Sequence, residues 1–570
     1  MKNRSFIITA LLSMVFVWGC SEDFIERPPD DTIVDANFWK TPDQILAGTA
    51  PLYNIAWFDY NDKASHGLGD GRGGMLSANY SYQLENIEFR TTALTAENSA
   101  SWSAFFKVVA HANMTMRNIQ QYADPSIPVE RVNAAIAEAR FMRGVAYMFL
   151  VMNWGAVPII TDNVKSSESP REIRRNTVES IWKFITNDLS YAVTHLPDTP
   201  LEPGRLTSWS AKGMLSKVYL TRAGVGASPG AKNQLYLDSA RILAQDVIEN
   251  SGATLMENYA DLFKTANNNN PETLFALQWT YDGSDWGSQN SVQAYLAFSS
   301  AITGFSDGWG GDLGASMYIL DLYEGLVENG STPDQRLKAS FMMPADHYSY
   351  IHQQVLDANG NPKVQELIVP VGGSGYNNRA WVKKYVVGRP EDNGGRVAQQ
   401  RTEIQTYMLR LADVYLIYAE AILGNQESTA DPQALTYFNR VRQRAGLQPK
   451  MQITFMDILE ERMVEFAMEG QSWYDFVRLH YYNPELAYEL LSTQNRGFVR
   501  ITPTLYAQRQ IDGETKEVAI SWKVEDEPDY TGPKNYNVNS GNFRLPIPEI
   551  EISNYPNLKE EPVDYDFNQG

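Results

Sequence analysis

Thiols and imidazoles are scarce in this chain, and their scarcity excludes several kinds of site. The 570 residues include one cysteine, Cys20, and six histidines. A single cysteine forms no internal disulfide, and a structural zinc site needs several soft ligands at close spacing. A catalytic thiol would need a base beside it, which so few histidines make hard to supply. No metal ion and no other cofactor is therefore expected.

Positive charge and long apolar runs are also in short supply. Lysine and arginine together number 48 against 68 aspartates and glutamates, which gives a formal net charge of −20. Such a surface repels nucleic acid and anionic lipid headgroups, so neither is expected as a main partner. Beyond the N-terminus, no apolar stretch approaches the ~20 residues that a membrane-spanning helix requires. The sequence therefore predicts no later transmembrane segment.

The N-terminus combines a cationic start, an apolar run and the only cysteine. Lys2 and Arg4 precede the apolar residues 6–18, a run too short to cross a bilayer comfortably. This pattern is typical of a signal peptide. Small Gly19 before Cys20 resembles the bacterial lipobox, in which the cysteine is acylated. The sequence therefore predicts a signal peptide over 1–19, acylation at Cys20, a tether over 20–40 and a single domain over 41–570.

Helical periodicity is the strongest structural signal in the chain. Thr41 followed by Pro42 is typical of a helix start, and the spacing of residues 130–153 predicts a long helix. Apolar residues recur on one face of that helix at intervals of three and four, namely Val132, Ala135, Ala139, Met142, Ala146 and Phe149. Further amphipathic segments follow at 177–196, 208–223, 234–249, 406–424 and 432–446. Paired amphipathic helices with short turns favour a tetratricopeptide-like stack of helix hairpins.

Two regions interrupt the helical pattern. Residues 251–405 contain many Gly and Asn and short strand-like pieces such as "ETLFALQW" and "AWVKKYVV". Residues 481–570 are also rich in loops. We therefore predict a mainly α fold with large loop-rich insertions and a few short strands. Its parts are a helical scaffold over 41–250 and 406–480, an insertion over 251–405 and a C-terminal segment over 481–570.

Five segments distributed along the chain carry a recognisable pattern. They are "AEARFMRGVAYMFLVMNWGAVPII" (137–160), "RLADVYLIYAEAILG" (410–424), "FNRVRQRAGL" (438–447), "ILEERMVEFAMEGQSWYDFVRL" (458–479) and "LPIPEIEISNYPNL" (545–558). Together with the start "CSEDFIERPPDD", and in this order, they resemble the SusD/RagB-like family of outer-membrane nutrient-binding lipoproteins.

This resemblance implies a SusD-like α-α superhelix and a place on the surface of a Bacteroidetes-type bacterium. Acylated Cys20 would hold the protein in outer-membrane lipid, and the acidic "SEDFIE" is similar to the family's export signal. The resemblance also implies capture of a nutrient polymer, usually a glycan, for a SusC-like TonB-dependent transporter. Members of the family bind rather than catalyse, so no enzymatic activity is expected.

Aromatic side chains on loops are the candidates for glycan contact. Aromatic faces stack on the apolar faces of sugar rings, while polar neighbours bond to hydroxyls. The richest stretch is 277–314, in the insertion that would face the ligand, and a second lies before the second long helix. The candidates are Trp279, Tyr281, Trp286, Tyr295 and Trp309, the polar partners Asp285, Gln289 and Asn290, and Tyr60 and Tyr82 from the second stretch. Trp57 and Trp102 are predicted to be core.

Three other functions stay open on the sequence alone: capture of peptides, as in RagB-like relatives, a surface glycosidase, and a structural lid without a ligand. A serine hydrolase is not favoured, because "GASPG" around Ser228 follows a helix and Pro229 has no N–H for an oxyanion. In "DANGNP" (357–362), Pro362 stands where a calcium loop needs glycine. That segment predicts a hairpin turn.

Overall fold

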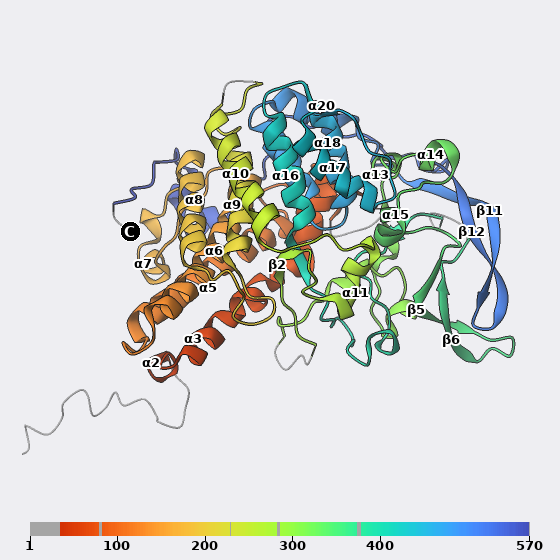
Figure 1. Ribbon diagram of the computed structural model, residues 1–570, viewed down its shortest axis with the longest axis horizontal. Coiled ribbons are helices and arrows are strands. Elements are labelled where there is room, and N and C mark those ends of the chain that lie inside the picture. The colour runs from red at the N-terminus through yellow and green to blue at the C-terminus, as the bar shows by residue number, and fades with distance from the viewer. Residues whose placement is uncertain (1–34, 79–82, 228–229, 282–285, 373–377, 569–570) are drawn as a thin grey trace, which may run out of the picture.

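Antiparallel helices form most of one side of the molecule, and small hairpins form the other (Figure 1). The computed structural model describes residues 35–568 except 79–82, 228–229, 282–285 and 373–377. The long helices are α5 (Ala96–Tyr122), α6 (Val129–Trp154), α8 (Val178–His195), α9 (Ser208–Arg222), α10 (Gln234–Asn250), α16 (Leu411–Leu423), α17 (Pro432–Arg444), α18 (Phe455–Glu465), α19 (Ser472–His480) and α20 (Pro484–Thr493). Among the described residues, no helix is both long and apolar enough to cross a membrane.

Shorter helices connect and cover this stack. They are α2 (Asp35–Phe38), α3 (Pro42–Thr49), α4 (Leu84–Ile87), α7 (Asn163–Glu168), α11 (Val292–Leu296), α12 (Ser300–Thr303), α13 (Met317–Asp321), α14 (Leu326–Asn329), α15 (Arg336–Ser340) and α21 (Glu549–Asn554). Trp39 is buried with Ile45 and Ile119, so the fold already includes the end of the predicted tether.

Side-chain caps start the helices where the sequence indicates. Thr41 Oγ1 accepts from the Gln44 N–H, and Pro42 occupies the first turn of α3, which confirms that helix start. Thr177 caps α8 in the same way through the Ser180 N–H. Each cap satisfies an N–H that has no partner within its helix, worth ~1 kcal/mol.

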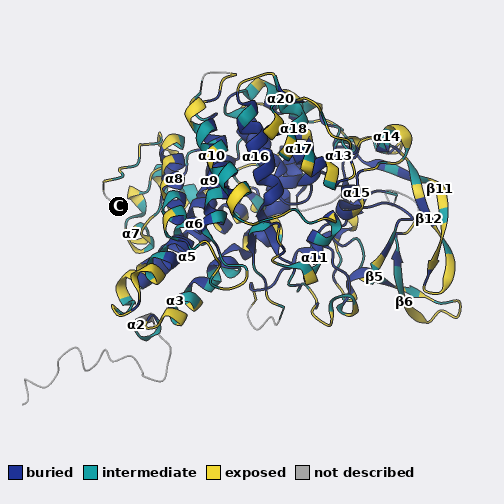
Figure 2. Cartoon of the chain, viewed as in Figure 1, coloured by how far each residue is buried: buried dark blue, intermediate teal, exposed yellow. Residues whose placement is uncertain are grey.

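Helix α6 is buried on nearly all sides from Ala134 onward (Figure 2). The predicted helix is confirmed, but it is not amphipathic, because α5 and α8 both pack against it. A Cβ on Gly144 would lie 3.4 Å from Asp188 and Leu189 of α8, so the small residue permits the close approach of the two helices.

The helical stack continues across the insertion. Helix α10 packs on α16 although residues 251–405 separate them in sequence (Figure 1). At the base of the insertion, β2 (Thr273–Leu277) pairs antiparallel with β8 (Thr406–Arg410), with Leu277 opposite Thr406. The strand predicted in "ETLFALQW" is thereby confirmed, and the insertion leaves and rejoins the scaffold at one place.

All strands in the described part of the chain form two-stranded sheets. Besides β2 and β8 they are β1 (Leu76–Ala78) with β3 (Leu313–Ala315), β4 (Phe341–Met342) with β7 (Trp381–Val382), β5 (His347–Leu356) with β6 (Pro362–Ile368), β9 (Ser428–Thr429) with β10 (Ile453–Thr454), and β11 (Val499–Ile511) with β12 (Glu514–Asp526). The turn at 357–361 joins β5 to β6, which confirms the predicted hairpin turn.

The C-terminal segment is more regular than its sequence indicated. It contains α20 and the β11–β12 hairpin, which projects beside β5 and β6 (Figure 1). Asp512 and Gly513 both have positive φ, at 52° and 78°, as a type I′ turn requires. The Asp-Gly pair is the sequence signal that could have identified this hairpin.

A buried ionic network ties the insertion to the second part of the scaffold. Arg410, at the end of β8, is hydrogen-bonded to Glu272, Glu465 and Glu469, and all four side chains are buried. Removing one partner from such a network leaves a buried charge unpaired, which costs ~3–5 kcal/mol. Glu461 belongs to the same network, because it is buried and lies 2.6 Å from Arg336.

Candidate functional site

One loop of the insertion presents predicted aromatic residues at the surface. The Thr280 N–H donates to the Ser288 carbonyl over 2.9 Å, which closes the loop that carries Tyr281 and Trp286. The Trp286 side chain is 58% exposed and meets the Phe58 ring edge-on, with 5.7 Å between centroids. Trp286 is thus a largely open ring with one supported edge.

A second pair of rings lies on and beside α11. Tyr295 is half-buried and Trp309 is 48% exposed, and their ring centroids lie 5.3 Å apart with planes at 60°. The Trp309 backbone N–H donates to the Ala294 carbonyl at 2.8 Å, which fixes the chain against α11. Edge-to-face pairs of this kind contribute ~0.5–1.5 kcal/mol. The orientation of Trp309 is therefore set before any ligand arrives.

A helical segment with π turns connects the two pairs. It comprises η4 (Tyr60–Ala64) and η5 (His66–Gly71) and begins just after Phe58. Phe58 contacts Trp286, and the Lys63 Nζ lies 5.4 Å from the centroid of the Tyr295 ring. Because Phe58 and Lys63 lie close together in the chain, one short stretch links the two exposed tryptophans. We call Tyr281, Trp286, Tyr295 and Trp309 the aromatic platform.

Polar groups lie beside Tyr295. Asp62 Oδ1 accepts from the Ser291 hydroxyl at 2.5 Å, and its other oxygen lies 3.6 Å from Lys63 Nζ. Burial raises the pKa of Asp62, while the Ser291 hydrogen bond and the Lys63 charge act in the opposite direction. Burial and the charge of Asp62 raise the pKa of Tyr295, so its hydroxyl keeps its proton at neutral pH. Charges of both signs thus lie among the rings, where sugar hydroxyls would find donors and acceptors.

Four predicted contact residues lie in the interior instead, namely Trp279, Tyr60, Gln289 and Asn290. Trp279 Nε1 donates to Thr406 Oγ1 at 3.0 Å, and Asn290 Nδ2 donates to the Ile404 carbonyl at 2.7 Å. The chain after β2 therefore stays bonded to the segment that leads into β8. This burial corrects the prediction of exposed positions for these four residues.

Three further predicted residues, Cys20, Tyr82 and Asp285, lie outside the described residues. Acylation of the first and glycan contact by the other two stay predictions. Trp57 and Trp102 are buried, which confirms that they belong to the core. Sequence reasoning missed Phe58 and Lys63, although the alternation of rings and charges in "WFDYNDK" (57–63) is a signal that could have found them.

A histidine–aspartate pair in η5 is structural. His66 Nδ1 lies 2.8 Å from Asp70 Oδ2, which also accepts from the Gly470 N–H at 3.0 Å. Both side chains are buried, and burial raises the pKa of Asp70. The pair has no open face for a polymer, so it holds η5 against the turn before α19. Among the described residues, no group of three or more His, Cys, Asp or Glu side chains could hold a metal ion.

Comparison with known proteins gives one family over most of the chain. A sequence profile described as "SusD family" matches residues 250–563, and one described as "Starch-binding associating with outer membrane" matches 23–220. A "SusD-like protein" from Bacteroides ovatus is 38% identical over 581 residues, which cover 100% of this chain and 99% of the relative.

Solved structures agree with these sequence matches. One crystal structure is 37% identical, with a TM-score of 0.80 over 93% of this chain and 100% of the other. A second, solved with xylogluco-oligosaccharide, is 36% identical, with a TM-score of 0.77 over 92% of this chain and 99% of the other. Both likenesses extend over nearly the whole mainly α fold.

Proposed function

This chain belongs to the SusD family, and from that membership we propose that it is a cell-surface lipoprotein that binds a glycan on the aromatic platform. One observation carries the proposal. Among the tryptophans in the described part of the chain, only Trp286 and Trp309 are largely exposed, and both belong to the platform. A large exposed ring that is held in place marks an interaction site rather than core.

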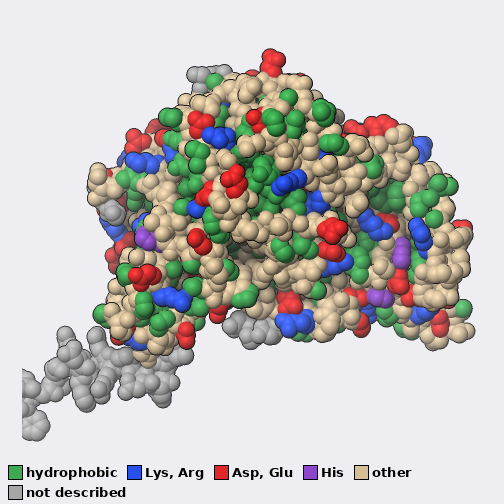
Figure 3. Space-filling model, in the orientation of Figure 1, with side chains coloured by type: hydrophobic (Ala, Val, Ile, Leu, Met, Phe, Trp, Pro, Cys, Tyr) green, Lys and Arg blue, Asp and Glu red, His purple; other side chains and the backbone are tan. Residues whose placement is uncertain are grey.

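The chemistry of the platform fits a neutral polysaccharide or oligosaccharide. Exposed aromatic faces stack on the apolar faces of sugar rings, and the groups around Asp62 and Lys63 can bond to hydroxyls. The formal charge of −20 disfavours a polyanion. On the visible face of Figure 3, side chains of both charge signs are scattered without a broad basic patch. The related structure solved with xylogluco-oligosaccharide supports that ligand as the first to test.

Delivery of this glycan to a SusC-like TonB-dependent transporter in the outer membrane completes the proposed role. The profile described as associating with the outer membrane supports that location, and the lipobox-like Gly19-Cys20 supports a lipid anchor. An anchored binder beside a pore raises the local concentration of polymer, so modest affinity suffices. We propose binding without a catalytic step, and Asp62 beside Tyr295 acts in this proposal as an acceptor that is already bonded to Ser291.

Affinity electrophoresis against plant, host and microbial polysaccharides tests the binding proposal. We expect one class of glycan to retard the protein and Trp286→Ala to abolish the retardation. Tyr506→Ala is the matched control, because Tyr506 is an exposed ring on the distant β11–β12 hairpin. If no glycan retards the protein, or if both variants behave alike, the platform is not a glycan site. Release of reducing sugar from the retained polymer would contradict a purely binding role.

A further inference from the structure

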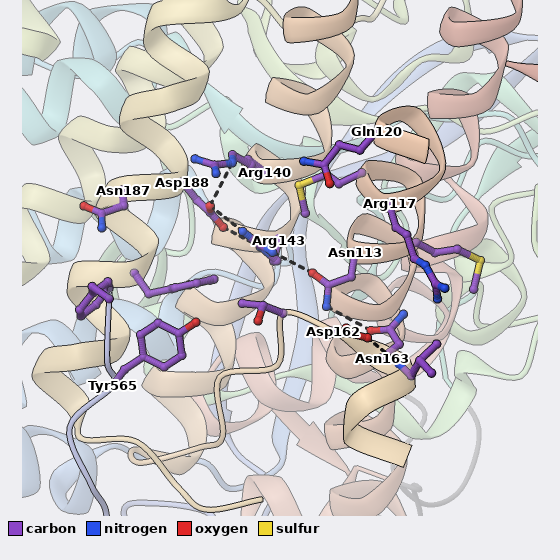
Figure 4. Close-up of a pocket in the computed structure, with 16 residues that line it drawn as sticks. Asn113, Arg117, Gln120, Arg140, Arg143, Asp162, Asn163, Asn187, Asp188 and Tyr565 are labelled. Carbon is purple, nitrogen blue, oxygen red and sulfur yellow. Dashed lines mark hydrogen bonds and ion pairs between the residues drawn. The ribbon is translucent and has the colours of Figure 1, made fainter. Parts of the chain in front are cut away.

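A second pocket, unconnected with the platform residues, opens between three scaffold helices and the C-terminal segment. It has a volume of about 470 Å³ and is lined by residues of α5, α6, α8, the start of α7 and the chain around Tyr565 (Figure 4). A volume of this size lies within the ~300–1,000 Å³ of small-molecule sites. Three arginines project into it, Arg117, Arg140 and Arg143, and we call it the arginine pocket.

One of these arginines forms a fixed floor. Arg143 donates two parallel hydrogen bonds to the Asp188 carboxylate, at 2.8 and 2.9 Å, and a third to Asn113 Oδ1 at 2.8 Å. Burial alone would lower the pKa of Arg143, but the charge of Asp188 and its hydrogen bonds raise it above its ordinary value. The floor is therefore charged and rigid, and it leaves Asp188 little capacity for a second cation.

The other two arginines retain free donors. The buried Arg140 Nε forms a long ion pair with Asp188 Oδ1 at 3.9 Å, beyond hydrogen-bond distance, and the guanidinium stacks 4.3 Å from the Tyr191 ring centroid. Its side chain is 36% exposed. Arg117 is exposed, and within the described part of the chain it makes no hydrogen bond or ion pair. The guanidinium of Arg140 makes no hydrogen bond among the described residues, so the exposed parts of Arg140 and Arg117 can both donate to an anion that enters the pocket.

The charge of the pocket contrasts with that of the chain. Three arginines face two carboxylates, those of Asp188 and Asp162, so the pocket has a net positive charge in a protein of formal charge −20. Asp162 is also engaged, because its Oδ1 accepts from the Val164 and Lys165 N–H groups at the start of α7. An anion that enters therefore meets positive charge that the protein itself does not neutralise.

The remaining walls have the composition of a sugar site. The rings of Tyr565 and Phe567 form one side, and Figure 4 shows the Tyr565 hydroxyl pointing into the hollow. The amides of Gln120 and Asn187 make no hydrogen bond within the described residues. Rings that cover an apolar face and free amides that read hydroxyls are the groups that recognise sugars, whereas a bare anion needs neither.

We propose that the arginine pocket is a second binding site, which takes a sugar unit that bears a carboxylate. Arg117 and Arg140 would hold the carboxylate through the planar fork geometry of guanidinium groups. Gln120, Asn187 and Tyr565 would contact the ring hydroxyls. No platform residue contributes to this pocket, so the second site does not depend on the platform proposal.

Calorimetric titration with D-glucuronic acid at low salt, against D-glucose and acetate, tests the second site. We expect glucuronic acid alone to bind measurably and its affinity to fall when NaCl is raised, because exposed charges are screened. Arg117→Ala and Arg140→Ala should each weaken binding about tenfold or more. Arg131→Ala is the matched control, because Arg131 is an exposed arginine of α6 with no bonded partner in the described chain. It should leave the affinity unchanged, as should Trp286→Ala.

Three results would overturn this proposal. Equal binding of glucose would show that the carboxylate is not recognised, and equal binding of acetate would show that the sugar is not. An Arg117→Ala affinity equal to that of Arg131→Ala would place the ligand elsewhere. Arg117 is exposed and unbonded, so its removal does not threaten folding, and melting curves of all variants verify this. If Trp286→Ala loses binding of the neutral glycan while the arginine variants keep it, the platform and the pocket are independent sites.

Discussion

Replacing Trp286 with alanine tests the aromatic platform, because the exposed area of this ring sets the affinity that should be lost. With 58% of its side chain exposed, the ring presents about 140 of the ~250 Å² of a large aromatic side chain. A sugar that covers one face would remove about half of this, ~70 Å², from water. At ~25 cal/mol per Å² that is ~1.8 kcal/mol, or about a 20-fold change in Kd. The variant should lose this affinity while losing only its edge contact with Phe58.

Calorimetric titration with the glycan that retards the protein measures this change, and thermal melting measures stability in parallel. Tyr506→Ala serves as the control, because it removes a ring that is 43% exposed on β11, away from the platform. The reasoning is refuted if Trp286→Ala binds within twofold of the unchanged protein. It is equally refuted if the loss of affinity follows a loss of folded protein, since the ring would then be structural.

Three further substitutions distinguish residues that contact the glycan from residues that stabilise the fold. Trp309→Ala should weaken binding of the same glycan about tenfold, since its ring is 48% exposed, and an unchanged titration would limit the platform to the Trp286 loop. Trp279→Phe removes the donor to Thr406 and should lower the unfolding free energy by ~1 kcal/mol in denaturant titrations, while weakening glycan affinity less than Trp286→Ala does. Stability should decrease as the pH is lowered. Burial alone would raise the pKa of Glu465, but the charges of Arg444, Arg410 and Arg336 hold it at about 2, against ~4.3 in the unfolded chain. This contribution is present above pH ~4.3 and lost as pH drops toward 2, so Glu465→Gln should lower the melting temperature at pH 7 and flatten the decline in acid.

The helical scaffold could be predicted because its signals are local. Thr41, Pro42 and Thr177 define helix starts within a few residues of sequence, and the structure places the caps there. The break at 251–405 is also visible as a change in composition. The burial of α6 on nearly all sides could not be predicted from its own sequence. It results from the packing of α5 and α8 against it, which the sequence of α6 does not indicate.

In the candidate site, local composition predicts which residues are exposed, whereas contacts with distant segments decide which are buried. Trp286 and Trp309 lie in stretches too rich in glycine and polar residues for a core, and both are exposed. Trp279, Gln289 and Asn290 belong to the same stretch but are buried, because the chain around them bonds to residues 402–406. That pairing joins segments more than a hundred positions apart, so composition alone could not reveal it. The arginine pocket likewise depends on the C-terminal chain returning to α8.

The ionic network and the platform are parts of one mechanical arrangement. Arg410 ends β8, and β8 pairs with β2, from which the platform loop departs directly after Leu277. The strand pair is thus anchored at one end by three buried carboxylates and supports exposed rings at the other. Because the strands that carry this loop are held in place, the loop loses little conformational freedom when a sugar binds. This favours affinity without a large contact area. Weakening the network at Glu465 should therefore reduce glycan affinity as well as stability, although no network residue touches the platform.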